Sequence, residues 1–304
     1  MRAASLKALA AITIWGASFV ATKVVVAQID PLALVTLRTF GGAVVLYALM
    51  RVRGRWDGWI RGRLLLDLAV LGLVGIALHL AIQAVGLTLT SATTTGWMVA
   101  LSPVFIALLS WRFLGERFGA RKVAGFALAM GGALLIVVAQ AGGLDVLALP
   151  STAGDVLVFS SAITWAVYSV LSKRVAGRRR PGVLMTHVMA LGCLWTLPAF
   201  VAREGWQAPG RLDATGWLAL GFLAVFVSAL AQLFWYDALA ELDASQVGVF
   251  LYIEPLVTLA LAALLLGEPV RPLTLAGGGA ILAGVWLVTR ARSGDPPGGP
   301  KASP

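Results

Sequence analysis

The sequence is poor in charged residues. Asp, Glu, Lys and Arg make up only 12% of its 304 residues, whereas about a quarter of a soluble domain is charged. A water-soluble fold of this length could not cover a 59% hydrophobic content with so few polar side chains. The composition therefore excludes a soluble domain and predicts a polytopic, all-α membrane protein.

The sequence also has few residues for metal or nucleophile chemistry. It contains one cysteine, Cys193, and two histidines, so an internal disulfide is excluded and no zinc cluster is expected. The P-loop, HExxH, CxxC and GxSxG motifs are absent. We therefore expect no cofactor, no metal site and no ATP-driven transport by this chain alone, and we expect Cys193 to serve packing.

The net charge of +10 has two readings. In a soluble chain it would suggest nucleic acid as a partner. In a membrane chain Lys and Arg accumulate on the cytoplasmic side, and we favour this reading. The expected partners are the lipid bilayer and a small molecule, not nucleic acid, and a monomer is compatible with the sequence.

Ten apolar runs are long enough to cross a bilayer, which takes about twenty residues. They cover 5–28, 32–50, 64–87, 91–113, 121–140, 154–175, 182–202, 214–238, 243–266 and 271–290. Nineteen Lys and Arg residues fall on one side of the resulting topology and three on the other. The positive-inside rule then places both termini in the cytoplasm, as expected for a bacterial inner-membrane protein.

One stretch of the chain occurs twice. WMVALSPVFIALLSWRFLGE (97–116) recurs as VFLYIEPLVTLALAALLLGE (249–268), each with a proline thirteen residues before a glutamate. At a spacing of 150, Trp15 also corresponds to Trp165 and Lys23 to Lys173. Five spans per half, an odd number, predict an inverted-topology repeat with a substrate site between the halves. The expected units are 1–148, 149–292 and a disordered tail, 293–304.

The repeated segments resemble a known family. The segments are TIWGASFVATK (13–23), its echo ITWAVYSVLSKR (163–174), and the two spans that contain Pro103 and Pro255 and end in Gly-Glu. They resemble EamA-type transporters of the drug/metabolite transporter superfamily. The resemblance implies two inverted five-helix repeats around a central cavity. It also implies export of small metabolites, with the bacterial amino-acid exporters most similar.

Polar and aromatic stripes mark candidate substrate-binding residues. Trp15 and Ser18 share one face of span 1, and Trp165 and Tyr168 share the equivalent face of span 6. These faces either line a cavity or pack against helices. The other candidates of this kind are His79 and Gln83 in span 3, Gln232 and Trp235 in span 8, and the aromatic residues Trp97 and Tyr252. His79 could instead form a structural interhelical hydrogen bond.

Glu254 is the one acidic residue near the middle of any span. A carboxyl group away from water holds its proton more strongly, so Glu254 is a candidate for proton coupling, together with His79. It could instead pair with a base or cap polar groups. Its repeat partner is Ser102, which cannot titrate, and the neighbouring Pro255, like Pro103, is a candidate hinge.

Several further residues are expected to have structural roles. Lys23 and Arg38 lie near span ends, where long basic side chains usually extend to the interface, with binding of a substrate carboxylate as the alternative. Glu116 and Glu268 are expected at helix ends, with a gate as the alternative. Small residues such as Ala127/Gly131 and Ala280/Gly284 are expected to pack spans 5 and 10 together.

The favoured function is a secondary carrier that exports small metabolites, most simply amino acids, by alternating access. Carriers of drugs, nucleosides or other metabolites remain alternatives within the same class. An intramembrane enzyme acting on a lipid or headgroup would need paired carboxylates or a metal cluster. A receptor or scaffold would not need inward polar stripes.

Overall fold

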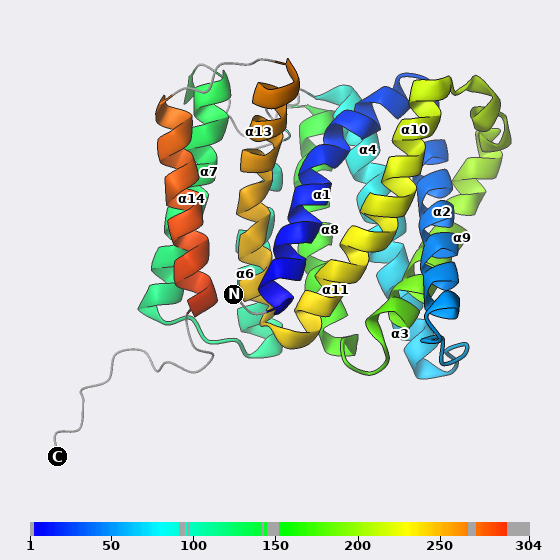
Figure 1. Cartoon of the computed structure of the whole chain (residues 1–304), viewed down its shortest axis with the longest axis horizontal. Coiled ribbons are helices and arrows are strands. Elements are labelled where there is room, and N and C mark those ends of the chain that lie inside the picture. The colour runs from blue at the N-terminus through cyan, green and yellow to red at the C-terminus, as the bar shows by residue number, and fades with distance from the viewer. Residues whose placement is uncertain are drawn as a thin grey trace.

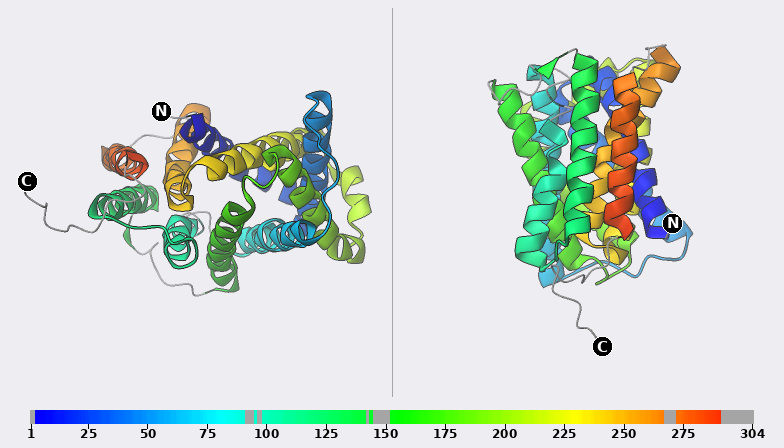
Figure 2. Two further views of the ribbon diagram at one scale, coloured as in Figure 1. Left: turned by 90° about the horizontal axis from the view of Figure 1, so that it is seen from below. Right: turned by 90° about the vertical axis from the view of Figure 1, so that its left-hand side faces the viewer.

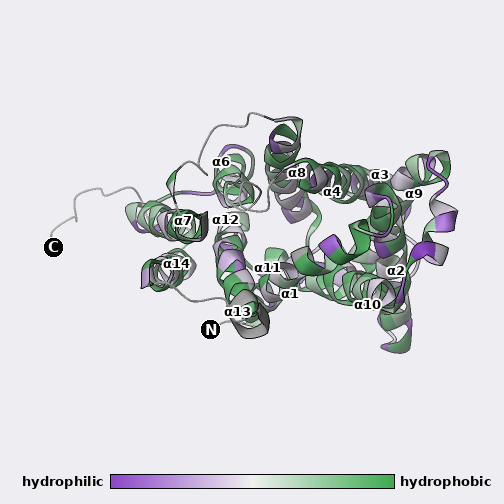
Figure 3. Cartoon of the chain, turned by 90° about the horizontal axis from the view of Figure 1, so that it is seen from above, coloured by the Kyte–Doolittle hydropathy of each residue, from purple (hydrophilic) through white to green (hydrophobic). Residues whose placement is uncertain are grey.

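The computed structural model describes residues 3–90, 95, 98–141, 143–144, 152–266 and 272–290. Every regular element in these ranges is a helix, and nine helices there are long and apolar enough to cross a membrane. Six of them are single α-helices: α1 (Ala3–Val26), α2 (Pro31–Val52), α7 (Ala120–Ala141), α8 (Ala153–Val175), α9 (Pro181–Ala202) and α14 (Pro272–Arg290). The helices are mostly coloured as hydrophobic in Figure 3.

Three further spans change helix type along their length. They are α3 (Arg63–Leu71), η1 (Gly72–Leu78) and α4 (His79–Leu89); α10 (Ala214–Phe222), η4 (Leu223–Ala231) and α11 (Gln232–Glu241); and α12 (Ala244–Gly248), η5 (Val249–Ile253) and α13 (Glu254–Leu266). At the place of the fourth expected span lies α6 (Ser102–Leu114), a shorter apolar helix. The predicted all-helical membrane fold is confirmed, with nine long helices and this short one in the described ranges.

The helices pack in pairs related by the sequence repeat (Figures 1 and 2). Helix α1 packs against α11 and α13, and its counterpart α8 packs against α4 and α6. Likewise α2 packs against α9 and η4, while α9 packs against α2 and η1. Each of these contacts between the halves thus has a counterpart, which is the arrangement expected for two interlocked repeats.

The two ends of the bundle differ in charge. The lower end in Figure 1 holds the start of α1, the α2–α3 and α8–α9 connections and the end of α14, and it carries the arginine-rich segments 51–63 and 173–180 (the basic end). Helix α1 starts at this end, whereas α8, which starts the second repeat, begins at the opposite end. The two repeats therefore run through the bundle in opposite directions.

Two π-helical segments occupy equivalent positions in the repeats. The segment η1 directly precedes His79, and η4 directly precedes Gln232. Both lie against glycines: a Cβ on Gly192 of α9 would be 2.5 Å from Ile76, and one on Gly42 of α2 would be 2.8 Å from Ser228. π-Helical turns are rare and often occur at functional sites. His79 and Gln232 are therefore structural equivalents, although their sequence spacing differs by one from that of the surrounding matches.

Each of the two candidate hinge prolines is the second residue of an α-helical segment. Pro103 lies in the first turn of α6, and Pro255 lies in the first turn of α13 after the 3₁₀ segment η5. Proline is well tolerated there because the first turn has no intrahelical partner for its missing N–H. The α-helix is thus interrupted before each proline, and bending at these points remains a prediction.

Helices α7 and α14 meet through small residues, and part of the set expected from sequence takes part: Ala280 lies 3.0 Å from the Cβ position of Gly132, and Gly284 lies against α7. A Cβ on Gly132 would be 2.5 Å from the Gly277 carbonyl oxygen, and one on Gly284 would be 2.5 Å from that of Gly125. Gly131, by contrast, has open space around its Cβ position. The expected Ala127/Gly131 contact is wrong, because the helix face in contact follows a seven-residue spacing from Gly125 to Gly132.

This difference gives a matched pair of variants. Gly132→Ala should lower the thermal unfolding temperature, because its methyl group meets backbone atoms that can move only by separating the helices, at a cost of about 1–3 kcal/mol. Gly131→Ala, one residue away in the same helix, should have little effect. Thermal unfolding of both purified proteins in the same detergent tests this. Equal unfolding temperatures would contradict the glycine-mediated contact.

Candidate functional site

A cavity lies between the two repeats. Its wall includes seven residues that the sequence singles out: Trp15, Ser18, His79, Gln83, Trp165, Gln232 and Glu254. Leu80, Val99, Ser102, Ser161, Ala162 and Leu251 complete it. The cavity has an accessible volume of about 70 Å³, which is enough for a few water molecules. The cavity is thus polar at several points and narrow in this conformation.

Tryptophans from three helices pack together at one side of the site, and two of them, Trp15 and Trp165, line the cavity. The ring centroid of Trp15 lies 5.0 Å from that of Trp165 and 5.2 Å from that of Trp235, and the last two are 5.7 Å apart. The His79 ring lies 5.1 Å from Trp165. Contacts of this kind contribute beyond simple area burial. The repeat-related pair Trp15 and Trp165 is therefore brought together across the two halves.

His79 has a structural hydrogen bond and also faces the cavity. Its Nδ1 lies 3.0 Å from the Ser161 carbonyl oxygen and 3.4 Å from the Thr164 hydroxyl. A carbonyl oxygen can only accept, so Nδ1 carries a proton, and in the neutral ring Nε2 is left as an acceptor. The structural and functional readings of His79 are therefore compatible.

Glu254 begins α13 at the point where the 3₁₀ segment ends. Its carboxylate lines the cavity and has no hydrogen-bond or ion-pair partner among the described residues. Helix α1 approaches closely here, since a Cβ on Gly16 would be 2.8 Å from Val257. This close approach places Trp15 and Glu254 on the same cavity. Ser102, the repeat partner of Glu254, lies on the wall as well.

A second, smaller cavity shares Ser18, Leu80 and Gln83 with the first and is also lined by Arg38. Arg38 is only 8% exposed, and its Nε donates to the Ser228 hydroxyl at 3.1 Å. No carboxylate of the described residues pairs with it. The expectation that Arg38 extends to the interface is wrong, because the glycine contact between α2 and η4 brings Ser228 beside the guanidinium. Lys23 is exposed, as expected.

Three of the expected aromatic residues lie behind the wall. The Tyr168 hydroxyl donates to Gln232 Oε1 at 3.3 Å, so Tyr168 orients a residue of the lining. Trp235 is fully buried in the tryptophan group. Tyr252 points toward α7, with its ring 6.5 Å from Phe126. Trp97 lies outside the described residues.

Some polar groups near the cavity are buried without a partner. Among the described residues, no hydrogen bond forms to Trp165 Nε1, Trp235 Nε1 or the Ser169 hydroxyl. Each such group costs about 1–3 kcal/mol when it is kept from water. Trp165 and Ser169 are four residues apart on α8, on the face that runs from the cavity toward the basic end.

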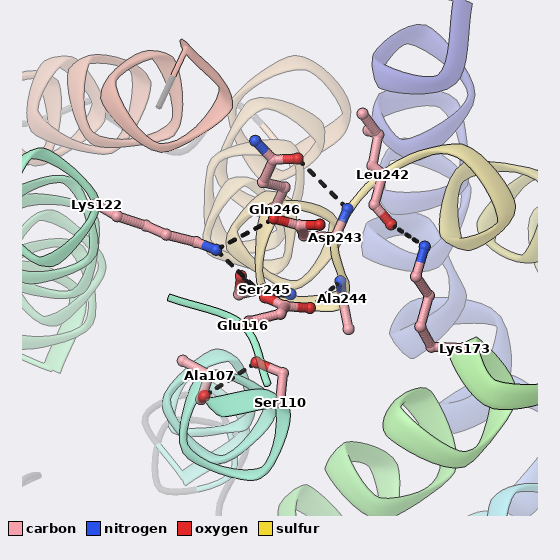
Figure 4. Close-up of polar contacts among 10 residues, drawn as sticks. All are labelled: Ala107, Ser110, Glu116, Lys122, Lys173, Leu242, Asp243, Ala244, Ser245 and Gln246. Carbon is pink, nitrogen blue, oxygen red and sulfur yellow. Dashed lines mark hydrogen bonds and ion pairs between the residues drawn. The ribbon is translucent and has the colours of Figure 1, made fainter. Parts of the chain in front are cut away.

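A network of polar contacts links the repeats at the basic end (Figure 4). The Glu116 carboxylate accepts from the backbone N–H groups of Ala244, at 2.7 Å, and Ser245, at 3.3 Å, and also from the Ser245 hydroxyl. Lys122 Nζ lies 3.2 Å from Glu116 and 3.5 Å from Asp243. The side chains of Lys122 and Glu116 are 5% and 7% exposed.

The network satisfies two helix ends. Glu116 binds free N–H groups at the start of α12, where a negative charge is stabilising. Lys173 Nζ donates to the carbonyl oxygens of Leu239 and Leu242, both at 2.7 Å, at the end of α11. The helix-end contact expected of Glu116 is observed, and it joins the α6–α7 connection of one repeat to α12 of the other. Glu268 lies outside the described residues.

Comparisons with known proteins agree with this architecture. The EamA-like transporter family matches the chain twice, over residues 2–138 and 152–290. One relative, a protein of Archaeoglobus fulgidus named as an uncharacterized transporter, is 32% identical over 91% of this chain and 93% of its own length. Another, from Streptantibioticus cattleyicolor and named as a probable terminal-alkyne amino-acid exporter, is 31% identical over 77% of this chain and 76% of its own.

A similar fold occurs in a crystal structure whose chain is 23% identical. The two superpose with a TM-score of 0.79, covering 94% of this chain and 98% of the other. The family match spans nearly all of both repeats, and the helical pairs described above are what such a repeat requires. The chain belongs to the EamA-like transporter family.

Proposed function

We propose that the protein exports amino acids, or metabolites with the same two charges, across the bacterial inner membrane by alternating access. The basic end faces the cytoplasm in this proposal, in agreement with the positive-inside rule. The substrate binds between the repeats, in the cavity that both of them line.

One observation carries the proposal: two cavities that share part of their wall are lined by a carboxylate and a guanidinium, neither with an oppositely charged partner among the described residues. Glu254 lines the larger cavity, and Arg38 lines the smaller one that shares its wall. An unpaired charge is costly in a membrane interior. A zwitterion would compensate both, with its ammonium group at Glu254 and its carboxylate at Arg38, where a guanidinium offers paired donors.

The wall between these charges suits an apolar side chain. Trp15, Trp165 and Leu251 supply large apolar surfaces, while Gln83 and Gln232 can donate or accept hydrogen bonds. The name of the Streptantibioticus cattleyicolor relative, a probable amino-acid exporter, supports the same substrate class.

Glu254 also offers a coupling mechanism. A single carboxylate can hold either a proton or the substrate's ammonium group, but not both. When substrate leaves on the outer side, a proton takes its place, and the protonated site returns to the inner side. Exchange of one for the other would drive export by the proton gradient, with the network around Glu116 closing the cytoplasmic side in alternate steps.

The charge pairing can be tested by competition in proteoliposomes. The best substrate is first chosen from a panel of labelled amino acids. Its two truncated analogues, the amine without the carboxylate and the acid without the ammonium group, should compete at least about tenfold more weakly, because each leaves a buried charge unpaired. Equal competition by either analogue would contradict the proposal.

Arg38→Gln should weaken binding of the intact amino acid and leave binding of the amine analogue nearly unchanged. Each charge-assisted hydrogen bond to the carboxylate contributes about 1.5–3 kcal/mol, so a loss of roughly tenfold or more is expected. Lys23→Gln is the matched control, since Lys23 is exposed on α1. The same loss in both variants would argue against a carboxylate site at Arg38.

A further inference from the structure

A groove of about 490 Å³ lies between α3 of the first repeat and α8 of the second, at the basic end. Arg63, Arg174 and Arg178 line it, with Asp67 as the one acidic residue. Its remaining lining is apolar and includes Val70 and Leu171. The central cavity shares none of these residues, so the groove is separate from the site proposed for transport.

The groove has an excess of positive charge. Arg178 pairs with Asp67 at 3.0 Å, which leaves Arg63 and Arg174 without a carboxylate among the described residues. Arg174 donates through Nη2 to the Phe113 carbonyl oxygen at 3.1 Å, which holds its guanidinium in place. No hydrogen-bond acceptor contacts Arg63 in the described part of the chain. The mouth of the groove is thus complementary to an anion.

The apolar part of the groove continues onto the outer surface of the bundle. Leu66 and Val70 of α3 are 67% and 48% exposed, and in a membrane-spanning helix such residues face lipid. A ligand that fills the groove therefore meets arginines at the membrane surface and hydrocarbon beneath them. A free anion would gain nothing from the apolar part.

The positive charge of the groove is not repeated at the equivalent place in the other half of the protein. Gln28 stands 150 residues before Arg178, at the opposite end of the bundle. It exchanges two hydrogen bonds with Asp213, one from its side-chain amide and one from the Asp213 backbone, both at 3.0 Å. The position related to Arg178 is therefore occupied by a neutral side chain, and Asp213 satisfies the hydrogen bonds of that side chain. Only at the basic end do α3 and α8 bring arginines together.

We infer that this groove binds an anionic phospholipid. The phosphate of the headgroup lies between Arg63 and Arg174, with one acyl chain along Val70 and Leu171. Arginine suits phosphate because its planar donors can form two hydrogen bonds at once. Basic pockets between membrane helices at the cytoplasmic surface are suited to such headgroups. A lipid bound here contacts both repeats.

Native mass spectrometry of the full-length protein tests the inference, with phosphatidylglycerol and phosphatidylcholine as the probes. Phosphatidylglycerol should bind at least about tenfold more tightly, and the double variant Arg63→Gln/Arg174→Gln should lose most of that preference. Arg117→Gln/Arg121→Gln is the control, because it removes the same charge from exposed positions at the same end. Equal losses in the two double variants, or none in the first, would overturn the site.

Two further experiments test whether a loss of binding is due to misfolding and whether the ligand is a lipid or a free anion. Arg63 is exposed, so Arg63→Glu should fold normally and should still lose the preference by charge repulsion. Its unfolding temperature in phosphatidylcholine should equal that of the unmodified protein. Glycerol phosphate, which has the headgroup charge but no acyl chain, should not displace phosphatidylglycerol at equal concentration. Displacement would show a site for a free anion and overturn the lipid assignment.

Discussion

Glu254→Gln should abolish uphill export while the protein still binds its substrate. Glutamine has nearly the same shape and can accept a hydrogen bond from an ammonium group, but it cannot carry a proton. Replacing a charged acceptor by a neutral one should weaken binding by roughly tenfold or less. Proton-driven accumulation, by contrast, requires the group that exchanges the proton, so its loss should be complete.

The measurement compares two assays in proteoliposomes: accumulation against a gradient under an imposed pH difference, and exchange of labelled for unlabelled substrate at equal pH. The variant should fail in the first and retain the second. The substrate affinity of the variant should also no longer depend on pH, because its side chain binds no proton in competition with the substrate. Glu241→Gln is the control, since Glu241 is exposed at the end of α11. Unchanged accumulation in Glu254→Gln would contradict coupling at this carboxylate.

Glu116→Ala should open the basic end. The change removes the acceptor for two backbone N–H groups and a hydroxyl, together with one of the two carboxylates near Lys122. Hydrogen bonds to a charged group contribute about 1.5–3 kcal/mol each. Losing three such bonds in the closed state, about 4.5 kcal/mol at the lower figure, should shift the balance toward an open state by on the order of a thousandfold or more.

A buried reporter on α8 can detect this opening. In a Cys193→Ser background, Ser172→Cys places a thiol at a fully buried position between the cavity and the basic end. A membrane-impermeant thiol reagent applied from the basic side should modify it much faster when Glu116→Ala is also present. Glu241→Ala, at the same end without such contacts, should leave the rate unchanged. No acceleration with Glu116→Ala would show that the network does not hold this end closed.

Sequence periodicity predicted much of the cavity wall because polar and aromatic residues recur on matched helix faces. Trp15, His79, Gln83 and Glu254 line the cavity because a polar group at mid-membrane must face the protein interior. Tyr252 shows the limit of that argument. Periodicity shows that an aromatic side chain points inward, but not whether it meets a cavity or a neighbouring helix.

Other features depend on contacts that sequence spacing cannot give. Arg38 turns inward because Gly42 lets η4 come close enough for Ser228 to accept its hydrogen bond. The π-helical segments before His79 and Gln232 differ in length, seven residues against nine, and spacing alone matched these two residues one position out of register. The contact through Gly132 instead of Gly131 depends on how α7 is rotated about its axis, because neighbouring residues of a helix point about 100° apart.

The partnerless donors near the tryptophans bear on the energy of the transport cycle. Trp165 Nε1, Trp235 Nε1 and the Ser169 hydroxyl are buried and have no hydrogen-bond partner among the described residues, and each would gain a hydrogen bond if water entered from the basic end. Hydration of these groups thus favours opening, while the contacts of Glu116 favour closure. A carrier works fastest when neither state is much more stable than the other, and in this protein water itself would supply part of that balance.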